Sequence, residues 1–201
     1  MISHKYKCIF VHIPKVAGQS IESFFIEKHG LTWNNRAPLL LRVNENPELG
    51  PPRLAHLNLY KYLEYQYISQ DLFDKYYKFS FVRNPWARTV SFYNYGLFYK
   101  KMTFKSFVTT VLPELIQSGN FFYQPQYDFL YKDNFTDINF VGRFENLEED
   151  FTQLCLNLNL SHTKLPYRNK TENKENSNKN LIARTKSLVK NPKTFFESKE
   201  S

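Results

Sequence analysis

The chain has 201 residues, of which 42% are hydrophobic and 17% aromatic, so it is long and apolar enough for one α/β domain with a sizeable core. Its formal charge of +8 is unevenly distributed along the chain. Residues 1–160 carry 17 basic and 15 acidic side chains, whereas residues 161–201 carry 10 basic and 4 acidic side chains. The body therefore lacks the basic face of a nucleic-acid-binding domain, and no nucleic-acid partner is expected. No signal-peptide pattern opens the chain, and no apolar run approaches the ~18 residues of a membrane span, so a cytoplasmic protein without a transmembrane segment is expected.

The first predicted elements are a strand at residues 6–13 and a helix at residues 19–29, joined by a turn that contains Lys15 and Gly18. A glycine-containing turn that enters a helix directs backbone N–H groups and the positive end of the helix dipole at one point, where an anion can bind. Lys15 adds a positive charge there. The turn is not a Walker A sequence, because Lys15 precedes the glycine, so chemistry other than ordinary ATP chemistry is expected.

The next part of the chain is less periodic. Residues 32–53 contain four prolines and are predicted to form a long irregular excursion. Residues 54–59 are predicted as a short strand, with His56 inside it, and residues 69–76 as a helix.

A second motif follows at the end of a predicted strand over residues 78–83. The strand ends at Arg83, and a helix begins at Pro85, a position that tolerates proline because the first helical N–H has no partner within the helix. The helix is predicted to run to about residue 100 and places Arg88 and Ser91 three residues apart. Arg88 is expected to form a structural ion pair.

The remaining elements are a helix over residues 103–118 that Pro113 bends or ends, a loop that begins at Gln124, a strand at residues 139–145 and a helix at residues 146–157. Strands that alternate with helices predict an α/β fold with a parallel sheet flanked by helices, in a single domain.

Ligands of such sheets bind beyond the carboxyl ends of the strands. Lys15 and Arg83 each follow such an end, so both are expected at the same edge of the sheet, the rim formed by the carboxyl ends of the strands. One ligand with two phosphate-like groups would fit there. The two cysteines, Cys8 and Cys155, lack metal-ligand spacing and are predicted as small core residues, so no metal site is expected.

The two motifs together read H-I-P-K-x-A-G-x-S and F-V-R-N-P-x-x-R-x-x-S-x-Y. This pair resembles the sulfotransferases that use 3′-phosphoadenosine 5′-phosphosulfate (PAPS), in particular the branch that includes carbohydrate 2-O-sulfotransferases. The resemblance covers about residues 6–155 and implies a P-loop NTPase-like fold. It implies that the first motif holds the 5′-phosphosulfate through Lys15, Gly18, Gln19 and Ser20, and that the second holds the 3′-phosphate through Arg83 and Ser91.

The resemblance also implies transfer of a sulfuryl group from PAPS to an acceptor hydroxyl, with a carbohydrate as the expected acceptor and no metal required. Such a transfer needs in-line geometry, stabilisation of charge on the departing 5′-phosphate and a base for the hydroxyl proton. Lys15 suits the leaving group. His56 is the expected base, because related sulfotransferases carry a catalytic histidine between the two motifs and a neutral imidazole suits this task near pH 7. If His56 does not lie near the loop of Lys15, Glu22 is the first other candidate.

Two other functions stay open. A P-loop kinase or NTPase would want an aspartate for Mg²⁺ at a strand end, where this chain has Arg83. A nucleotide-binding protein without catalysis is the other, because the chain departs from the family pattern after about Pro166. Residues 1–165 are thus predicted as the sulfotransferase domain and residues 166–201 as a basic, polar, mobile tail.

Overall fold

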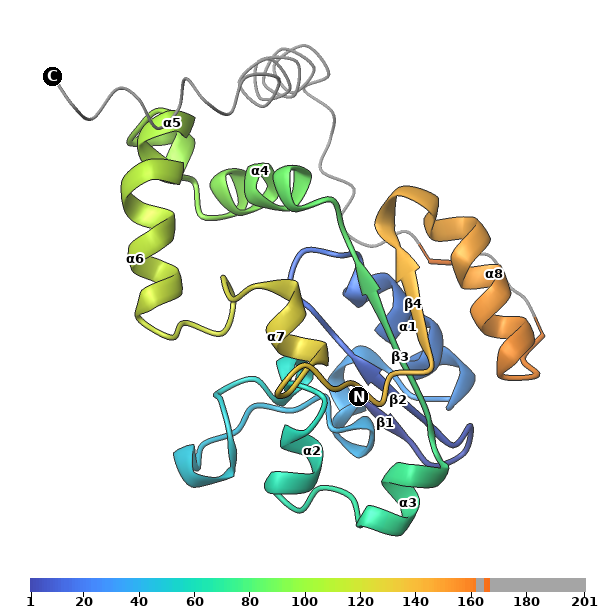
Figure 1. Cartoon of the computed structure of the whole chain (residues 1–201). Helices are drawn as coiled ribbons and strands as arrows, with labels where there is room; N and C mark the ends of the chain where they lie inside the picture. Colours follow the sequence, from blue (N-terminus) through green and yellow to red (C-terminus); the bar gives the residue numbers. More distant parts are fainter. Residues whose placement is uncertain (162–164, 167–201) are drawn as a thin grey trace, which may run out of the picture. The chain divides into compact units, whose positions relative to one another are not determined.

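The computed structural model describes residues 1–161, 165 and 166, and its central feature is a four-stranded sheet in the order β1-β2-β3-β4 (Figure 1). The strands are β1 (Ile2–Ser3), β2 (Cys8–Val11), β3 (Tyr77–Val82) and β4 (Phe140–Arg143). β2, β3 and β4 run parallel to one another, whereas β1 pairs antiparallel with β2. The prediction of a parallel sheet is therefore correct for the three later strands, and the sheet as a whole is mixed.

The antiparallel edge follows from a short connection. Only residues 4–7 join β1 to β2, and Lys7 reverses the chain with a left-handed backbone (φ 48°). A parallel pair needs a crossover of a dozen or more residues, so this connection can only form a hairpin.

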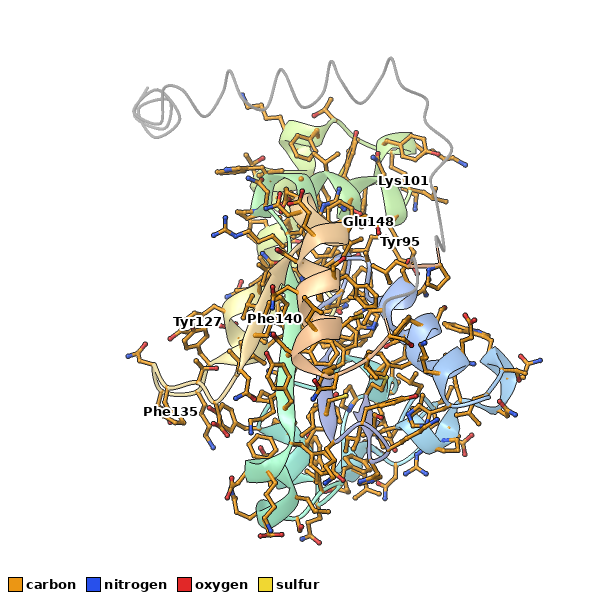
Figure 2. All side chains as sticks on the ribbon, turned by 90° about the vertical axis from the view of Figure 1, so that its right-hand side faces the viewer. Tyr95, Lys101, Tyr127, Phe135, Phe140 and Glu148 are labelled. Carbon is orange, nitrogen blue, oxygen red and sulfur yellow. The ribbon has the colours of Figure 1, made fainter. Side chains whose placement is uncertain are left out.

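Helices flank the sheet within the described part of the chain. They are α1 (Gly18–Lys28), α2 (Lys61–Glu64), α3 (Gln70–Lys75), α4 (Pro85–Tyr95), α5 (Phe104–Ser106), α6 (Leu112–Gln117), α7 (Gln126–Leu130) and α8 (Leu147–Asn157). Figures 1 and 2 show α1 on one face of the sheet and α7 on the other, with α4, α5 and α6 beyond the carboxyl end of β3. Among the described residues, no helix is both long and apolar enough to cross a membrane.

Aromatic side chains form the core between the sheet and α1. The register pairs Phe10 with Phe79, and their rings stack with centroids 5.1 Å apart. Phe25 of α1 packs on Phe79 at 5.8 Å, while Phe24 meets Phe151 of α8 edge-on at 4.9 Å. The sheet and both helices therefore share one hydrophobic core.

Both cysteines are buried and free, as predicted for core residues. Burial raises the pKa of Cys8 to about 12 and that of Cys155 to about 11. Neither thiol is therefore activated for nucleophilic or redox chemistry.

The strand predicted at residues 54–59 is wrong. Leu54–His56 forms a 3₁₀ turn instead, and Leu54, Leu57 and Leu59 are buried without joining the sheet. The alternation of leucines reflects burial against the core, which a turn followed by an extended segment satisfies as well as a strand does.

The helix predicted over residues 103–118 is interrupted, as expected. A π-helical turn at Phe107–Val111 separates α5 from α6, and Pro113 is the second residue of α6. Proline has no N–H to donate and its ring clashes with the carbonyl four residues earlier, so the wider turn lies where a regular helix could not continue. The helix predicted from Pro85 to about residue 100 ends earlier, at Tyr95, before a left-handed Leu97 (φ 55°).

The predicted tail at residues 166–201 and its mobility lie outside the described residues, apart from Pro166. Leu165, the residue before it, is buried in the main core.

Candidate functional site

The loop that joins β2 to α1 has an unusual backbone. Lys15 and Ala17 both adopt left-handed conformations, with φ 71° and 68°. Such conformations are costly for residues other than glycine and persist where the surrounding structure enforces them, often at ligand-binding positions. Ala17 provides no side-chain cap for α1, so the positive end of this helix opens toward the loop.

Gly18 has a role that differs from the one the sequence suggested. It is the first residue of α1 and has no positive φ, so the turn itself does not require glycine. A Cβ atom at this position would lie 2.0 Å from Cδ2 and Nε2 of His12. Glycine is needed because the imidazole ring of His12 occupies the space of a side chain.

The structure brings the residues of the first motif together at the start of α1. Gln19 is exposed, whereas Ser20 is buried and its N–H donates to the carbonyl oxygen of Ala17 at 2.9 Å. Lys15 is half-buried, and its Nζ lies 4.1 Å from the centroid of the Tyr95 ring.

Arg83 connects the second motif to the first. Its Nη1 donates to the carbonyl oxygen of Lys15 at 3.3 Å, although 68 positions separate the two residues in the sequence. Its guanidinium carbon lies 4.1 Å from the centroid of the Phe144 ring, and its Nε is buried without a hydrogen-bond acceptor among the described residues. The expectation that both motifs meet on one rim is therefore met by the geometry.

The side chain of Gln126, at the start of α7, forms hydrogen bonds with both the N–H and the carbonyl oxygen of Arg83. Its Oε1 accepts the N–H of Arg83 at 2.8 Å, and its Nε2 donates to the carbonyl oxygen of Arg83 at 2.7 Å. The next residue is held too, because Glu145 Oε1 accepts the N–H of Asn84 at 2.8 Å. Sequence reasoning missed Gln126, because nothing in the loop Gln-Pro-Gln-Tyr indicates which backbone its side chains contact.

Arg88 fastens α4 to the loop. Its Nε donates to the carbonyl oxygen of Pro14 at 2.9 Å, and its Nη1 donates to that of Gln124 at 2.9 Å. The prediction of an ion pair for Arg88 is wrong within the described part of the chain, since its guanidinium donates there to backbone carbonyl oxygens. Burial lowers the pKa of Arg88 to about 10.

One face of α4 lies toward the loop. Arg88, Ser91 and Tyr95 recur at intervals of three and four residues and therefore share a side of the helix. Since Arg88 contacts Pro14 and Tyr95 contacts Lys15, Ser91 between them also lies on the loop-facing side. In Figure 2, Tyr95 lies in the upper half of the view, below Lys101, while Tyr127 lies on the opposite side of the sheet from α1.

His56 lies beside this loop and not in the core. Its Nδ1 donates to the carbonyl oxygen of His12 at 2.9 Å, and its half-buried ring stacks near Phe121 at 5.7 Å. Phe122 lies edge-on to His56 and stacks on Tyr95, with centroids 6.5 and 5.3 Å apart. His56 and Lys15 are therefore linked through two aromatic rings on the same rim.

Burial lowers the pKa of His56 to about 3, and the charges of His12 and Arg53 add to this shift. The ring is consequently neutral at pH 7. Because Nδ1 carries the proton that bonds to His12, Nε2 carries the lone pair.

The other described histidines have local partners. His4 Nδ1 bonds Tyr76, and His29 Nε2 bonds Ser3. His12 Nδ1 bonds Oε1 of Glu22 at 2.6 Å, with both residues buried. Glu22 is therefore occupied and enclosed, which leaves His56 as the better candidate base.

Among the described residues, the cations of the rim have no carboxylate at ion-pair distance. No ion pair between described residues includes Lys15, Arg83 or Arg88. Burial, and to a lesser degree the charge of Arg83, lowers the pKa of Lys15, while burial lowers the pKa of Arg83 against the opposing effect of Glu145. Partly buried cations that lack anionic partners mark a place where an anion is stabilised.

Comparison with known proteins identifies the family of the chain. The sequence profile of the sulfotransferase family matches residues 1–199, farther than the motif-bearing part of the chain, and the chain belongs to this family. An uncharacterised protein of Archaeoglobus fulgidus is 34% identical over an alignment of 99 residues, which covers 46% of this chain and 76% of that protein. No solved structure matches the chain significantly.

Arg88→Ala is expected to destabilise the fold by about 2 to 3 kcal/mol, because it removes hydrogen bonds from a charged donor and leaves carbonyl groups unpaired. Chemical denaturation measures the change. Arg88→Lys should recover little of it, since one ammonium cannot reproduce the two directions of the guanidinium. Full stability of the alanine variant would show that α4 is held by its apolar contacts alone.

Proposed function

We propose that the chain transfers a sulfuryl group from PAPS to a hydroxyl of an acceptor, and that the acceptor is a carbohydrate. The observation that carries this proposal is the hydrogen bond between Arg83 and the carbonyl oxygen of Lys15, which joins two cationic motifs at the carboxyl ends of β2 and β3. Membership of the sulfotransferase family supports the reaction class. The succession of strand, loop and helix at Lys15 also supports a P-loop NTPase-like fold.

The residues at the rim fit a donor with anionic groups at two positions. We assign the 5′-phosphosulfate to Lys15, Gly18, Gln19 and Ser20, at the start of α1. We assign the 3′-phosphate to Arg83 and Ser91, because the buried Nε of Arg83 has no acceptor within the described part of the chain and the loop-facing side of α4 presents Ser91. The donor supplies the sulfuryl group, and the protein binds it, orients it and stabilises charge.

Lys15 is assigned to the leaving group. Its ammonium and the loop N–H groups stabilise the negative charge that develops on the 5′-phosphate as the sulfuryl group departs. The contact with Tyr95 holds the ammonium near the loop.

His56 is assigned as the general base. Its Nδ1–H bond to His12 leaves Nε2 to accept the proton of the acceptor hydroxyl. A pKa of about 3 makes the ring a weak base in the free protein. Negative charge placed near an imidazole favours its protonated form, so donor binding strengthens the base.

The acceptor is assigned to the side of the rim that carries aromatic rings. Phe121 and Phe122 flank His56, and Tyr95 extends this wall toward Lys15. Flat aromatic rings pack well against the apolar faces of sugar rings while leaving the hydroxyl groups to polar partners. This arrangement supports a carbohydrate acceptor.

Calorimetric titration tests the donor assignment. The wild-type chain should bind adenosine 3′,5′-bisphosphate more tightly than adenosine 5′-phosphate or ATP with Mg²⁺. Arg83→Ala should weaken binding of the bisphosphate by ~2 to 5 kcal/mol, because it removes one partner of a desolvated charge pair, with a smaller loss in Ser91→Ala. Arg42→Ala, at an exposed arginine, is the matched control. Equal weakening for adenosine 5′-phosphate, or preference for ATP with Mg²⁺, would contradict the assignment.

Lys15→Ala should lower the turnover number for sulfuryl transfer more than it lowers affinity for adenosine 3′,5′-bisphosphate. The charge of Lys15 matters most when negative charge develops on the leaving phosphate. Transfer from radiolabelled PAPS to a panel of saccharides measures turnover, with the exposed Lys132→Ala as control. Wild-type turnover in Lys15→Ala would refute the role given to the loop.

His56→Ala should keep bisphosphate binding near wild type and lower sulfation by roughly 10² to 10⁴. In the wild-type chain, kcat/KM should stay level from pH 8 down to pH 5, because a base with its pKa near 3 remains unprotonated over that range. An unperturbed histidine would instead lose activity near pH 6.5. Wild-type sulfation by His56→Ala would mean that another group takes the proton.

A further inference from the structure

A buried, hydrogen-bonded pair of a histidine and a carboxylate lies next to the loop between β2 and α1, and the reaction described above does not use it. His12, immediately after β2, and Glu22, on α1, are 5% and 3% exposed. Their Nδ1 and Oε1 atoms are 2.6 Å apart. A carboxylate accepts hydrogen bonds only, so Nδ1 of His12 carries a proton.

The His12 ring touches the start of the proposed donor site. A Cβ atom on Gly18 would lie 2.0 Å from Nε2 and Cδ2 of His12, which shows that the ring packs against the backbone where α1 begins. The ring of Phe10 also stacks on the His12 ring, with centroids 5.5 Å apart. Steric contacts and the hydrogen bond to Glu22 together fix the place of the His12 ring, and Glu22 fixes which of its nitrogens carries the proton.

His12 also touches the proposed base. Its carbonyl oxygen accepts the Nδ1–H of His56 at 2.9 Å, and the two imidazole centroids are 4.3 Å apart. The side chain and backbone of one residue therefore contact both the start of α1 and His56.

We propose that His12 and Glu22 form a positioning pair: Glu22 holds the His12 ring by its hydrogen bond, and the ring and carbonyl oxygen of His12 hold His56 at a fixed place beside the loop. Neither residue is proposed to touch the reacting atoms. This inference rests on the proposed function only in assigning His56 as the base. The charged and titratable groups around the pair are His56, the amino group of Met1 and Tyr62, and those around His56 are His12, Arg53 and the same amino group.

Glu22→Gln tests the pair, because it keeps the shape of the side chain and removes its charge. A glutamine can donate as well as accept, so it no longer dictates the proton position on His12. We expect turnover to fall roughly 10-fold to 100-fold, as for other residues that orient a functional group, with the KM for PAPS changed less than about 2-fold. Glu27→Gln, at an exposed position on the same helix, is the matched control and should leave both values unchanged.

A double-mutant cycle separates positioning from a general structural effect. If Glu22 acts through His56, Glu22→Gln should cause no further loss of residual turnover in a His56→Ala background. A loss of the same size in both backgrounds would overturn the proposal.

Nitrogen NMR of the imidazole rings provides a readout that does not depend on catalysis. In the wild type at pH 7, both His56 and His12 should carry a proton on Nδ1, and Glu22→Gln should measurably lower the fraction of His12 that is protonated at Nδ1. Absence of the Nδ1 proton from either ring in the wild type, or an unchanged Nδ1 signal of His12 in a folded Glu22→Gln variant, would overturn the proposal. The wild-type measurement decides the matter even if the variant does not fold. If the chain transfers no sulfuryl group, the NMR result still stands, so failure of the proposed function is distinguishable from failure of the positioning pair.

Discussion

The hydrogen bonds of the Arg88 guanidinium are the interaction on which the site depends. One donor reaches Pro14 in the loop after β2, and another reaches Gln124 in the segment before α7. These bonds hold α4 against the loop between β2 and α1, so Ser91 and Tyr95, on the same side of α4 as Arg88, face the loop. Since the acceptors are carbonyl groups and not carboxylates, the bonds hold the chain together without neutralising the positive charge.

That choice of acceptor has an electrostatic consequence. A carboxylate beside Arg88 or Arg83 would stabilise the free protein and compete with an incoming anion. Glu145 comes nearest to this role, yet its Oε1 accepts the N–H of Asn84. The burial of the cations at the rim is therefore unfavourable in the free protein and becomes favourable when an anion binds beside them. This is the arrangement expected of an anion-binding site.

Much of the fold follows from local patterns. The sequence predicts several elements correctly, because each has a clear apolar period and a turn or proline at its boundary. They are the strand before Lys15, the helix after it, the strand that ends at Arg83 and the helix α8. The prediction of a strand at residues 54–59 is wrong, because buried leucines do not show whether a neighbouring strand is present to pair with them. The helix α7 is missed because its five residues are too few to show a helical period.

The candidate site is predictable only in part, for a different reason. Lys15 and Arg83 are identified because each stands at a boundary between a strand and a helix, and parallel strands bring such boundaries to one rim. Gln126, Glu22 and the contact of His12 with Gly18 depend on which side chains meet after folding. A glycine three residues after a lysine suggests a turn, and only the structure shows that Gly18 makes room for an imidazole ring.

On the proposed function, donor binding and proton acceptance become coupled. In the free protein, burial and the charges of His12 and Arg53 disfavour the imidazolium form of His56. An anionic donor on the adjacent loop acts in the opposite direction, so the ring becomes a stronger base when there is a sulfuryl group to transfer. The Nδ1–H bond to His12 keeps the ring in place through this change, because Nδ1 donates in both the neutral and the protonated form. A histidine anchored to a backbone carbonyl can therefore gain and lose its second proton without reorienting.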